Sequence, residues 1–200
     1  FQDVLAYVVL LITLLLFHAA FTYSIFLKFI GGLNPLTFYR KMKDVALFAF
    51  STSSSAATIP VTLRTVNQDL GVNQNVASFV VPVGATINMD GTAIMQGLAT
   101  VFIAQMSGID LTLFQYIQVV LLAVATSIGT AAVPSAGTIT LIIILQQFNL
   151  PLEAIGIILA VDRVLDMIRT SVNVTGDAAI ACIVAKTENQ LDENIFNSKA

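Results

Sequence analysis

The residues with the richest chemistry lie close together near the C-terminal end of the chain. Asp162 is followed after 4, 7, 11 and 15 positions by Asp166, Arg169, Asn173 and Asp177. If this stretch is a helix, in which each residue turns the chain by about 100°, the five side chains share a sector of about 80°. Arg169 presents a planar fork that suits a carboxylate, Asp166 can pair with an ammonium group, and Asn173 adds an amide. The strip therefore predicts a binding site for a charged ligand.

A structural ion-pair network is the alternative interpretation of this strip, with Asp162 or Asp166 neutralising Arg169. Buried ion pairs rarely repay the cost of their desolvation, which favours the ligand site. A run of hydroxyl side chains over Ser51–Ser55 is a second candidate element of the site. Combined with the charged strip, these hydroxyl groups suit a zwitterion that carries an extra carboxylate.

Asp90 and Asp177 predict a site for a cation. Asn88 and Gly91 flank Asp90, and Gly176 precedes Asp177, so we expect both stretches to unwind and to free backbone carbonyl groups. Carboxylate, carbonyl and amide oxygens without a soft ligand suit an alkali cation better than a transition metal. We expect no other cofactor.

Enzyme chemistry fits the chain poorly. His18 is the only histidine and Cys182 the only cysteine, which argues against a histidine-based metal site, a Ser-His-Asp triad and a disulfide framework. The stretch Val174–Asp177 lacks the first glycine of the Gly-x-Gly-Asp motif of intramembrane aspartyl proteases, and the chain has no phosphate-binding P-loop. We therefore expect a protein that is not an enzyme. For His18 we favour a packed side chain over a proton relay.

The composition indicates whether this site belongs to a soluble protein or to a membrane protein. Charged residues make up 10% and apolar residues 56% of the 200 residues, whereas a soluble domain has about 25% charged residues. No Lys or Arg lies between Arg64 and Arg163. So long a stretch without a basic residue predicts a polytopic membrane protein. The net charge of −3, without a basic stripe, excludes nucleic-acid binding.

Apolar runs and their interruptions divide the chain into five membrane elements. The basic residues Arg40–Lys43 predict a cytoplasmic loop. The stretch after this loop is too short to cross twice, so we expect a re-entrant hairpin there, and the uncharged stretch after Asp110 predicts a second hairpin from the opposite face. The expected elements are a helix over 4–30, hairpin 1 over 44–70, a broken helix over 76–109, hairpin 2 over 111–150 and a polar-faced helix over 153–185.

The arrangement of these elements predicts a transporter. Both halves follow one plan, a hairpin and then a broken or polar-lined helix, in inverted orientation, which is typical of secondary transporters with a site at the midplane. The fold class we expect is therefore an all-α polytopic membrane protein. Residues 189–200 are expected to form a solvated cytoplasmic tail. A hydroxyl-lined ion channel is the alternative from another class, although the Asp166/Arg169 pair suits a stoichiometric ligand better than a pore lining.

Four sequence motifs occur in a specific order: SSSAATIP at 53–60, NMDGT at 88–92, SIGTAAVP at 127–134 and DMIRTSVNVTGD at 166–177. In these motifs the chain resembles the dicarboxylate/amino acid:cation symporter family, the glutamate and aspartate transporters. The resemblance covers nearly the whole chain. It implies three transmembrane helices and two oppositely oriented re-entrant hairpins, which form most of an elevator-type transport domain over residues 1–188. That domain would move against a trimerisation scaffold outside this chain.

The resemblance also implies which residues hold the ligands. The implied substrate-binding residues are Ser53, Ser55, Thr92, Val133, Gly137, Asp166, Arg169, Thr170 and Asn173. The implied sodium ligands are Gly84, Thr86, Asn88, Asp90, Ser127, Ile128, Thr130, Asn173 and Asp177. Hairpin 2 would close over the substrate as the outer gate.

The function implied by the resemblance is secondary active import of L-glutamate or L-aspartate, coupled to sodium. Family members that carry C4-dicarboxylates tend to lack the aspartate at 166, and those that carry neutral amino acids tend to lack the arginine at 169. A C4-dicarboxylate or cystine carrier, coupled to protons or sodium, is the alternative. The implied setting is the lipid bilayer of the plasma (inner) membrane, as a multi-pass homotrimer. Since the chain starts at Phe1 without Met, we expect it to be the C-terminal half of a longer protein.

Overall fold

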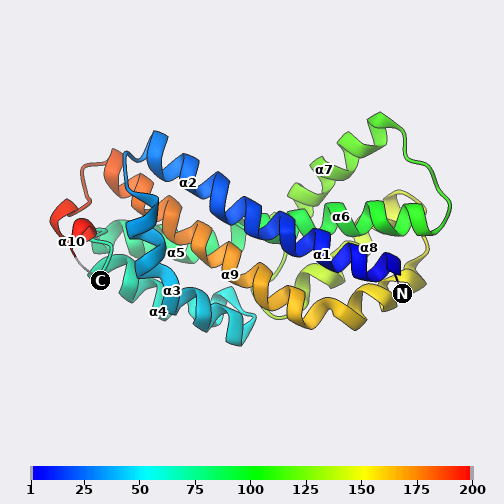
Figure 1. The fold of residues 1–200 in the computed structure, drawn as a ribbon, viewed down its shortest axis with the longest axis horizontal. Helices are drawn as coiled ribbons and strands as arrows, with labels where there is room; N and C mark the ends of the chain where they lie inside the picture. The colour runs from blue at the N-terminus through cyan, green and yellow to red at the C-terminus, as the bar shows by residue number, and fades with distance from the viewer. Residues whose placement is uncertain (1, 199–200) are drawn as a thin grey trace.

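The computed structural model describes residues 2–198, and these residues form helices connected by short turns (Figure 1). One isolated β-bridge, between Val72 and Leu191, occurs among them. The all-α architecture is therefore confirmed. The longer helices are α1 (Gln2–Phe17), α3 (Pro35–Thr52), α4 (Ser55–Gln68), α5 (Gln74–Ile87), α6 (Asp90–Met106), α7 (Leu113–Ile128), α8 (Ala136–Gln147) and α9 (Ile155–Thr187).

The first helix is continuous over Gln2–Ile30, although its winding changes along its length. After α1 it passes through the π-helical turn η1 (His18–Thr22), the short α2 (Tyr23–Ile25) and the π-helical turn η2 (Phe26–Ile30). Among the described residues this is the one helix that is both long and apolar enough to cross a membrane. Most of its large apolar side chains point outward, as an apolar surrounding would require.

Hairpin 1 consists of α3 and α4 and is longer than expected. Asn34 caps α3 by accepting a hydrogen bond from the Leu36 amide, and Pro35 occupies the first helical position. The expectation that Arg40–Lys43 form a loop is wrong, because these basic residues lie inside α3. The tip is at Ser53, which has a left-handed backbone with φ 52°.

The broken helix forms as expected. Its two halves, α5 and α6, are separated at Asn88 and Met89, whose backbones leave the helical region. An Asn-Met-Asp-Gly sequence inside an apolar run therefore marked the break correctly.

Hairpin 2 consists of α7 and α8, joined by a tip over residues 129–135. A capping box at Thr112 starts α7, and Ser135 at the end of the tip has φ 60°. With 16 and 12 residues, the two arms are about 24 Å and 18 Å long, so each is shorter than a hydrocarbon core of about 30 Å.

The polar-faced helix α9 is unbroken over 33 residues. Our expectation that the backbone unwinds at Asp177 is therefore wrong. Gly176 serves close packing instead, since a Cβ there would lie 2.5 Å from the Tyr23 hydroxyl and 2.7 Å from Asn88 Nδ2. Only a glycine lets these two side chains approach the helix so closely.

α9 runs through the middle of the molecule (Figure 1). It packs against α1, α3, α4, α5, α6 and α8. Figure 1 shows α3–α5 around its C-terminal half and α6–α8 around its N-terminal half. Hairpin 1 and hairpin 2 therefore approach the centre of α9 from opposite ends.

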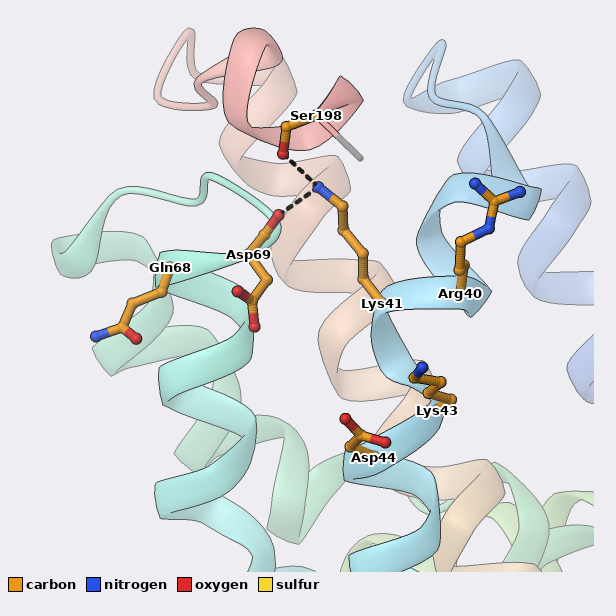
Figure 2. Close-up of a pocket in the computed structure, with 7 residues that line it drawn as sticks. All are labelled: Arg40, Lys41, Lys43, Asp44, Gln68, Asp69 and Ser198. Carbon is orange, nitrogen blue, oxygen red and sulfur yellow. Dashed lines mark hydrogen bonds between the residues drawn. The ribbon is translucent and has the colours of Figure 1, made fainter. Parts of the chain in front are cut away.

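The segment that we expected to be a solvated tail is more ordered than that up to residue 198. After a β-bridge to Val72, it forms α10 (Glu193–Asn197), whose Phe196 is only 1% exposed. Lys41 of α3 donates hydrogen bonds to the Asp69 carbonyl at 2.8 Å and to Ser198 Oγ at 3.2 Å (Figure 2). It also donates to the Ile195 carbonyl at 2.7 Å. This lysine joins the C-terminal segment to the base of hairpin 1.

Candidate functional site

A small buried cavity lies where the two hairpin tips meet the centre of α9. Every substrate-binding residue expected from the sequence lines it, namely Ser53, Ser55, Thr92, Val133, Gly137, Asp166, Arg169, Thr170 and Asn173. These residues come from both hairpins, α6 and α9. The sequence analysis did not include Met89, Ala131 and Ala132, which also line the cavity. Their small or apolar side chains carried no chemical signal.

Asp166 and Arg169, the charged residues of α9 that line this cavity, are paired with each other. Arg169 Nη2 contacts Asp166 Oδ1, and Arg169 Nη1 lies 3.5 Å from Asp162 Oδ1. The backbone N–H of Ser135, at the tip of hairpin 2, donates to Asp166 Oδ2 at 2.9 Å. The ion pairs that we considered as an alternative therefore form, and Asp166 and Arg169 among their members line the cavity.

The two hairpin tips contact each other directly beside these charges. Ser54 Oγ donates to the Ala132 carbonyl at 2.8 Å, and the Ala56 N–H donates to the same carbonyl at 3.3 Å. The cavity between the tips and α9 measures about 20 Å³. That volume holds about one water molecule. An organic ligand can enter only if the tips separate.

Hairpin 1 presents an unused hydroxyl group to this cavity. Ser53 is 2% exposed, and its Oγ has no hydrogen-bond partner among residues 2–198. A buried hydroxyl without a partner costs about 1–3 kcal/mol, which a ligand acceptor or a water would recover. The tip of hairpin 1 is therefore prepared to bind a polar group.

A second polar cluster lies further along α9, toward its C-terminal end. Asn88 Nδ2 donates to Asp177 Oδ1 at 2.9 Å, and a Cβ at Gly84 would lie 2.6 Å from the same carboxylate oxygen. Asn173 Oδ1 accepts from the Gly91 N–H at 2.8 Å. The break between α5 and α6 therefore lies against Asn173 and Asp177, where carboxylate, amide and carbonyl oxygens come together.

Asp90 faces the first helix. His18 Nε2 lies 3.1 Å from Asp90 Oδ2, and the Tyr23 hydroxyl donates to the same oxygen at 3.2 Å. The Tyr23 hydroxyl also lies 3.3 Å from the Val172 carbonyl of α9. His18 is thus a hydrogen-bonding partner of an expected cation ligand.

The other expected cation ligands are less clearly grouped. Ser127 and Thr130 are buried, whereas Thr86 and Ile128 are exposed. Within residues 2–198, no group of three or more His, Cys, Asp or Glu side chains could hold a metal ion. A second site at Thr86, Ser127, Ile128 and Thr130 stays a prediction.

Comparison with known proteins identifies the family. Residues 1–187 match the Sodium:dicarboxylate symporter family. The chain belongs to this family. It is 48% identical over 151 residues to an excitatory amino acid transporter of Caenorhabditis elegans, which is 76% of this chain and 30% of that protein. It is 43% identical over 178 residues to human excitatory amino acid transporter 2, which is 89% of this chain and 31% of that protein.

A third relative, mouse excitatory amino acid transporter 3, is 45% identical over 167 residues, which is 83% of this chain and 32% of that protein. The chain thus spans about a third of the length of these relatives. The resemblance seen in the four motifs is confirmed. Because the family consists of symporters, the expectation that the chain is not an enzyme is confirmed as well.

A larger cavity of about 300 Å³ lies elsewhere in this symporter chain, at the base of hairpin 1 (Figure 2). Its lining is charged and polar and consists of Arg40, Lys41, Lys43, Asp44, Gln68, Asp69 and Ser198. No residue of the four motifs borders it. The smaller cavity, in contrast, lies where both hairpins, the helix break and Asp166 and Arg169 of α9 converge.

Gln96 is a polar residue that the sequence analysis missed. It is 0% exposed in α6 and hydrogen-bonds to α7 and α8 of hairpin 2. A glutamine inside an apolar run was the available signal, because a buried amide needs partners. Those partners lie 30 to 44 positions away in the chain, so the sequence could not name them.

Proposed function

We propose that the protein of which this chain is a part is a sodium-coupled symporter that imports L-glutamate or L-aspartate. The observation that carries the proposal is the convergence of all nine expected substrate-binding residues on one buried cavity. Asp166 and Arg169 in this cavity match the ammonium and side-chain carboxylate groups of an acidic amino acid. The relatives' printed names, excitatory amino acid transporters, agree with this substrate class.

The substrate would bind by exchanging partners with the ion pair. Arg169 would leave Asp166 and take the side-chain carboxylate in a bidentate pair, and Asp166 would take the α-ammonium group. The α-carboxylate would accept hydrogen bonds from the tip of hairpin 1 and from Asn173. Each buried charge keeps an opposite charge throughout, which avoids the cost of several kcal/mol of an unpaired ion.

Sodium would bind beside the substrate, at the break between α5 and α6. Asp177 and the carbonyl oxygens of Gly84 and Asn88 form the first proposed set of ligands, with Asn173 between them and the substrate. Asp90 would take part in a further set. Because Asn173 belongs to both the substrate and the cation cluster, occupancy of one would favour occupancy of the other.

The membrane arrangement is also part of the proposal. Hairpin 1 and hairpin 2 would be re-entrant from the cytoplasmic and external faces, with residues 40–43 and the C-terminal segment in the cytoplasm. The transport domain would move as an elevator against a scaffold, in a homotrimer within the plasma (inner) membrane. Irregular backbone at the tips, at Ser53 and Ser135, is tolerated at membrane depth because protein surrounds it.

The test uses the full-length protein in proteoliposomes. Uptake of labelled L-aspartate is followed with and without an inward sodium gradient, for the wild type, Arg169→Ala and Arg163→Ala. Arg163 is exposed on the same helix and serves as the matched control. We expect sodium-driven uptake that Arg169→Ala lowers by at least about 30-fold and Arg163→Ala leaves unchanged.

Three other outcomes would redirect the proposal. Uptake that is indifferent to sodium would move the coupling to protons. Uptake of succinate or cystine that survives Asp166→Ala would identify the alternative carriers of this family. A substrate-gated conductance without net accumulation would identify a channel.

A further inference from the structure

Gln96 binds both arms of hairpin 2 from behind the cavity. Its Nε2 donates to the Gly137 carbonyl at 3.0 Å and to Thr140 Oγ1 at 2.8 Å, and both acceptors belong to α8. Its Oε1 accepts from Thr126 Oγ1 of α7 at 2.8 Å. One side chain of α6 thus joins the descending and ascending arms of the same hairpin.

The hydrogen bonds around Gln96 form a closed network. Thr140 Oγ1 lies 2.9 Å from Thr130 Oγ1, and the Thr130 hydroxyl donates to the Thr126 carbonyl at 2.8 Å. Gln96 is completely buried. A satisfied buried network specifies one arrangement, because removing any member leaves another polar group without a partner.

Residues 131–135 at the tip of hairpin 2 lie beyond this network and are held differently. Ala131, Val133 and Pro134 are exposed, and the tip contacts the rest of the chain through the Ala132 carbonyl and the Ser135 N–H. The Ser135 N–H bonds to Asp166, the residue that a substrate ammonium would engage. These contacts can therefore be exchanged when a ligand enters, whereas the Gln96 network need not change.

We infer that Gln96 is a positioning residue that anchors hairpin 2, so that the tip opens and closes about a fixed root. The inference rests on the proposed function, because it assigns hairpin 2 the role of a gate over the substrate. The gate would swing about the level of Gln96, Thr126, Thr130 and Thr140, and residues 131–135 would move. Without the anchor, the closed position of the tip would no longer be favoured.

The anchor is tested first by transport kinetics of the full-length protein. Gln96→Met keeps the volume of the side chain and removes the amide. We expect the KM for the transported amino acid to rise about tenfold, the effect of losing one buried hydrogen-bonded anchor. Gln118→Met, at an exposed position of α7, is the matched control and should keep the wild-type KM.

A double-mutant cycle tests whether the two arms are coupled through Gln96. Thr140→Val removes one partner hydroxyl while keeping the shape of the side chain. If Gln96 and Thr140 act through one network, the double variant should be no worse than Gln96→Met alone. Multiplicative effects of the two substitutions would contradict the inference.

A direct measurement of the gate separates this role from a merely structural one. The variant Ala131→Cys reports the accessibility of the tip. The variant Leu113→Cys reports the accessibility of the rest of the hairpin, since Leu113 lies at the far end of α7 and is 79% exposed. The natural Cys182 is completely buried and should not react. The rate of labelling by a membrane-impermeant maleimide is measured with saturating substrate and sodium.

We expect Gln96→Met to speed labelling at residue 131 about tenfold and to leave labelling at residue 113 unchanged. Equal acceleration at both positions would mean general loosening and would overturn the inference. So would wild-type labelling together with a wild-type KM. Failure of the proposed function gives a different result, since the wild-type protein would then neither accumulate the amino acid nor show protection of residue 131 by it.

Discussion

At the scale of single residues, α9 combines charged side chains with positions where no side chain fits. Gly176 allows the Tyr23 hydroxyl and Asn88 to approach the helix, and Gly84 lies directly against the Asp177 carboxylate. These glycines fix the distance between the helix break and the cation cluster. The oxygen atoms proposed to hold sodium are therefore positioned by the absence of side chains as much as by their presence.

Gly176→Ala should destabilise the protein by about 1–3 kcal/mol, because its Cβ would lie 2.5 Å from the Tyr23 hydroxyl. Thermal unfolding in detergent measures the effect. Gly97→Ala is the matched control, since nothing lies within 4 Å of a Cβ at that helical position. The control should be neutral or stabilise by up to about 1 kcal/mol. Equal effects of the two substitutions would refute the packing argument.

Asp177→Asn should lower the apparent affinity for sodium at least about tenfold, because binding of a hard cation depends on the charge of its ligands. The asparagine keeps the size of the side chain, so expression and fold should be retained. The measurement is the sodium dependence of L-aspartate uptake in proteoliposomes. Asp110→Asn, at an exposed position, should leave that dependence unchanged. An unaltered sodium dependence in Asp177→Asn would remove Asp177 from the cation site.

At the scale of elements, the sequence predicted where helices are interrupted better than where they continue. The break at Asn88–Met89 and the turn at Ser53 were predictable because Asn, Gly and Ser interrupt apolar runs at those points. Gly176 also suggested a break in the helix, but α9 is continuous there. A glycine inside a helix can instead serve close packing. Asn34-Pro35 was ambiguous, since these residues can end one helix and start another.

Long-range polar contacts were beyond the reach of the sequence. The charged face of α9 was predictable from a helical period, and Asp166, Arg169 and Asn173 of this face line one cavity. Gln96 has no such period, and a single polar residue in an apolar helix does not reveal its partners. The same holds for Lys41, whose partners at Ile195 and Ser198 lie more than 150 positions away.

Lys41→Met should release the C-terminal segment from hairpin 1. Burial lowers the pKa of the Lys41 ammonium at the base of the hairpin, and the nearby Asp69 carboxylate opposes this effect. Losing its three hydrogen bonds should cost about 1–3 kcal/mol of local stability. Faster amide hydrogen exchange over residues 189–198 would show the release. Lys43→Met, at an exposed position two residues away, should leave exchange in this segment unaltered.

At the scale of the whole molecule, the two hairpins reach the centre of α9 from opposite ends and close one site between them (Figure 1). The contact is direct, because the Ala56 N–H donates to the Ala132 carbonyl. With a cavity of about 20 Å³, the described arrangement has no room for an amino acid. The proposed transport therefore requires that the tips part and meet again.

Joining the tips covalently should stop transport. A hydrogen bond of 3.3 Å between Ala56 N and Ala132 O brings the two residues near the separation that a disulfide needs. The variant Ala56→Cys/Ala132→Cys should lose L-aspartate uptake on mild oxidation and regain it on reduction. Each single variant should be indifferent to the oxidant. Full uptake by a demonstrably cross-linked double variant would show that the tips need not separate.

Both hairpins turn on a serine with a left-handed backbone, Ser53 with φ 52° and Ser135 with φ 60°. Glycine and asparagine accept this conformation readily, whereas a β-branched residue is strained in it. A mutational library selected for folded protein would therefore admit the same few amino acids at two positions that lie far apart in the chain. The two tips would tolerate change in parallel, although no hydrogen bond joins the two serines.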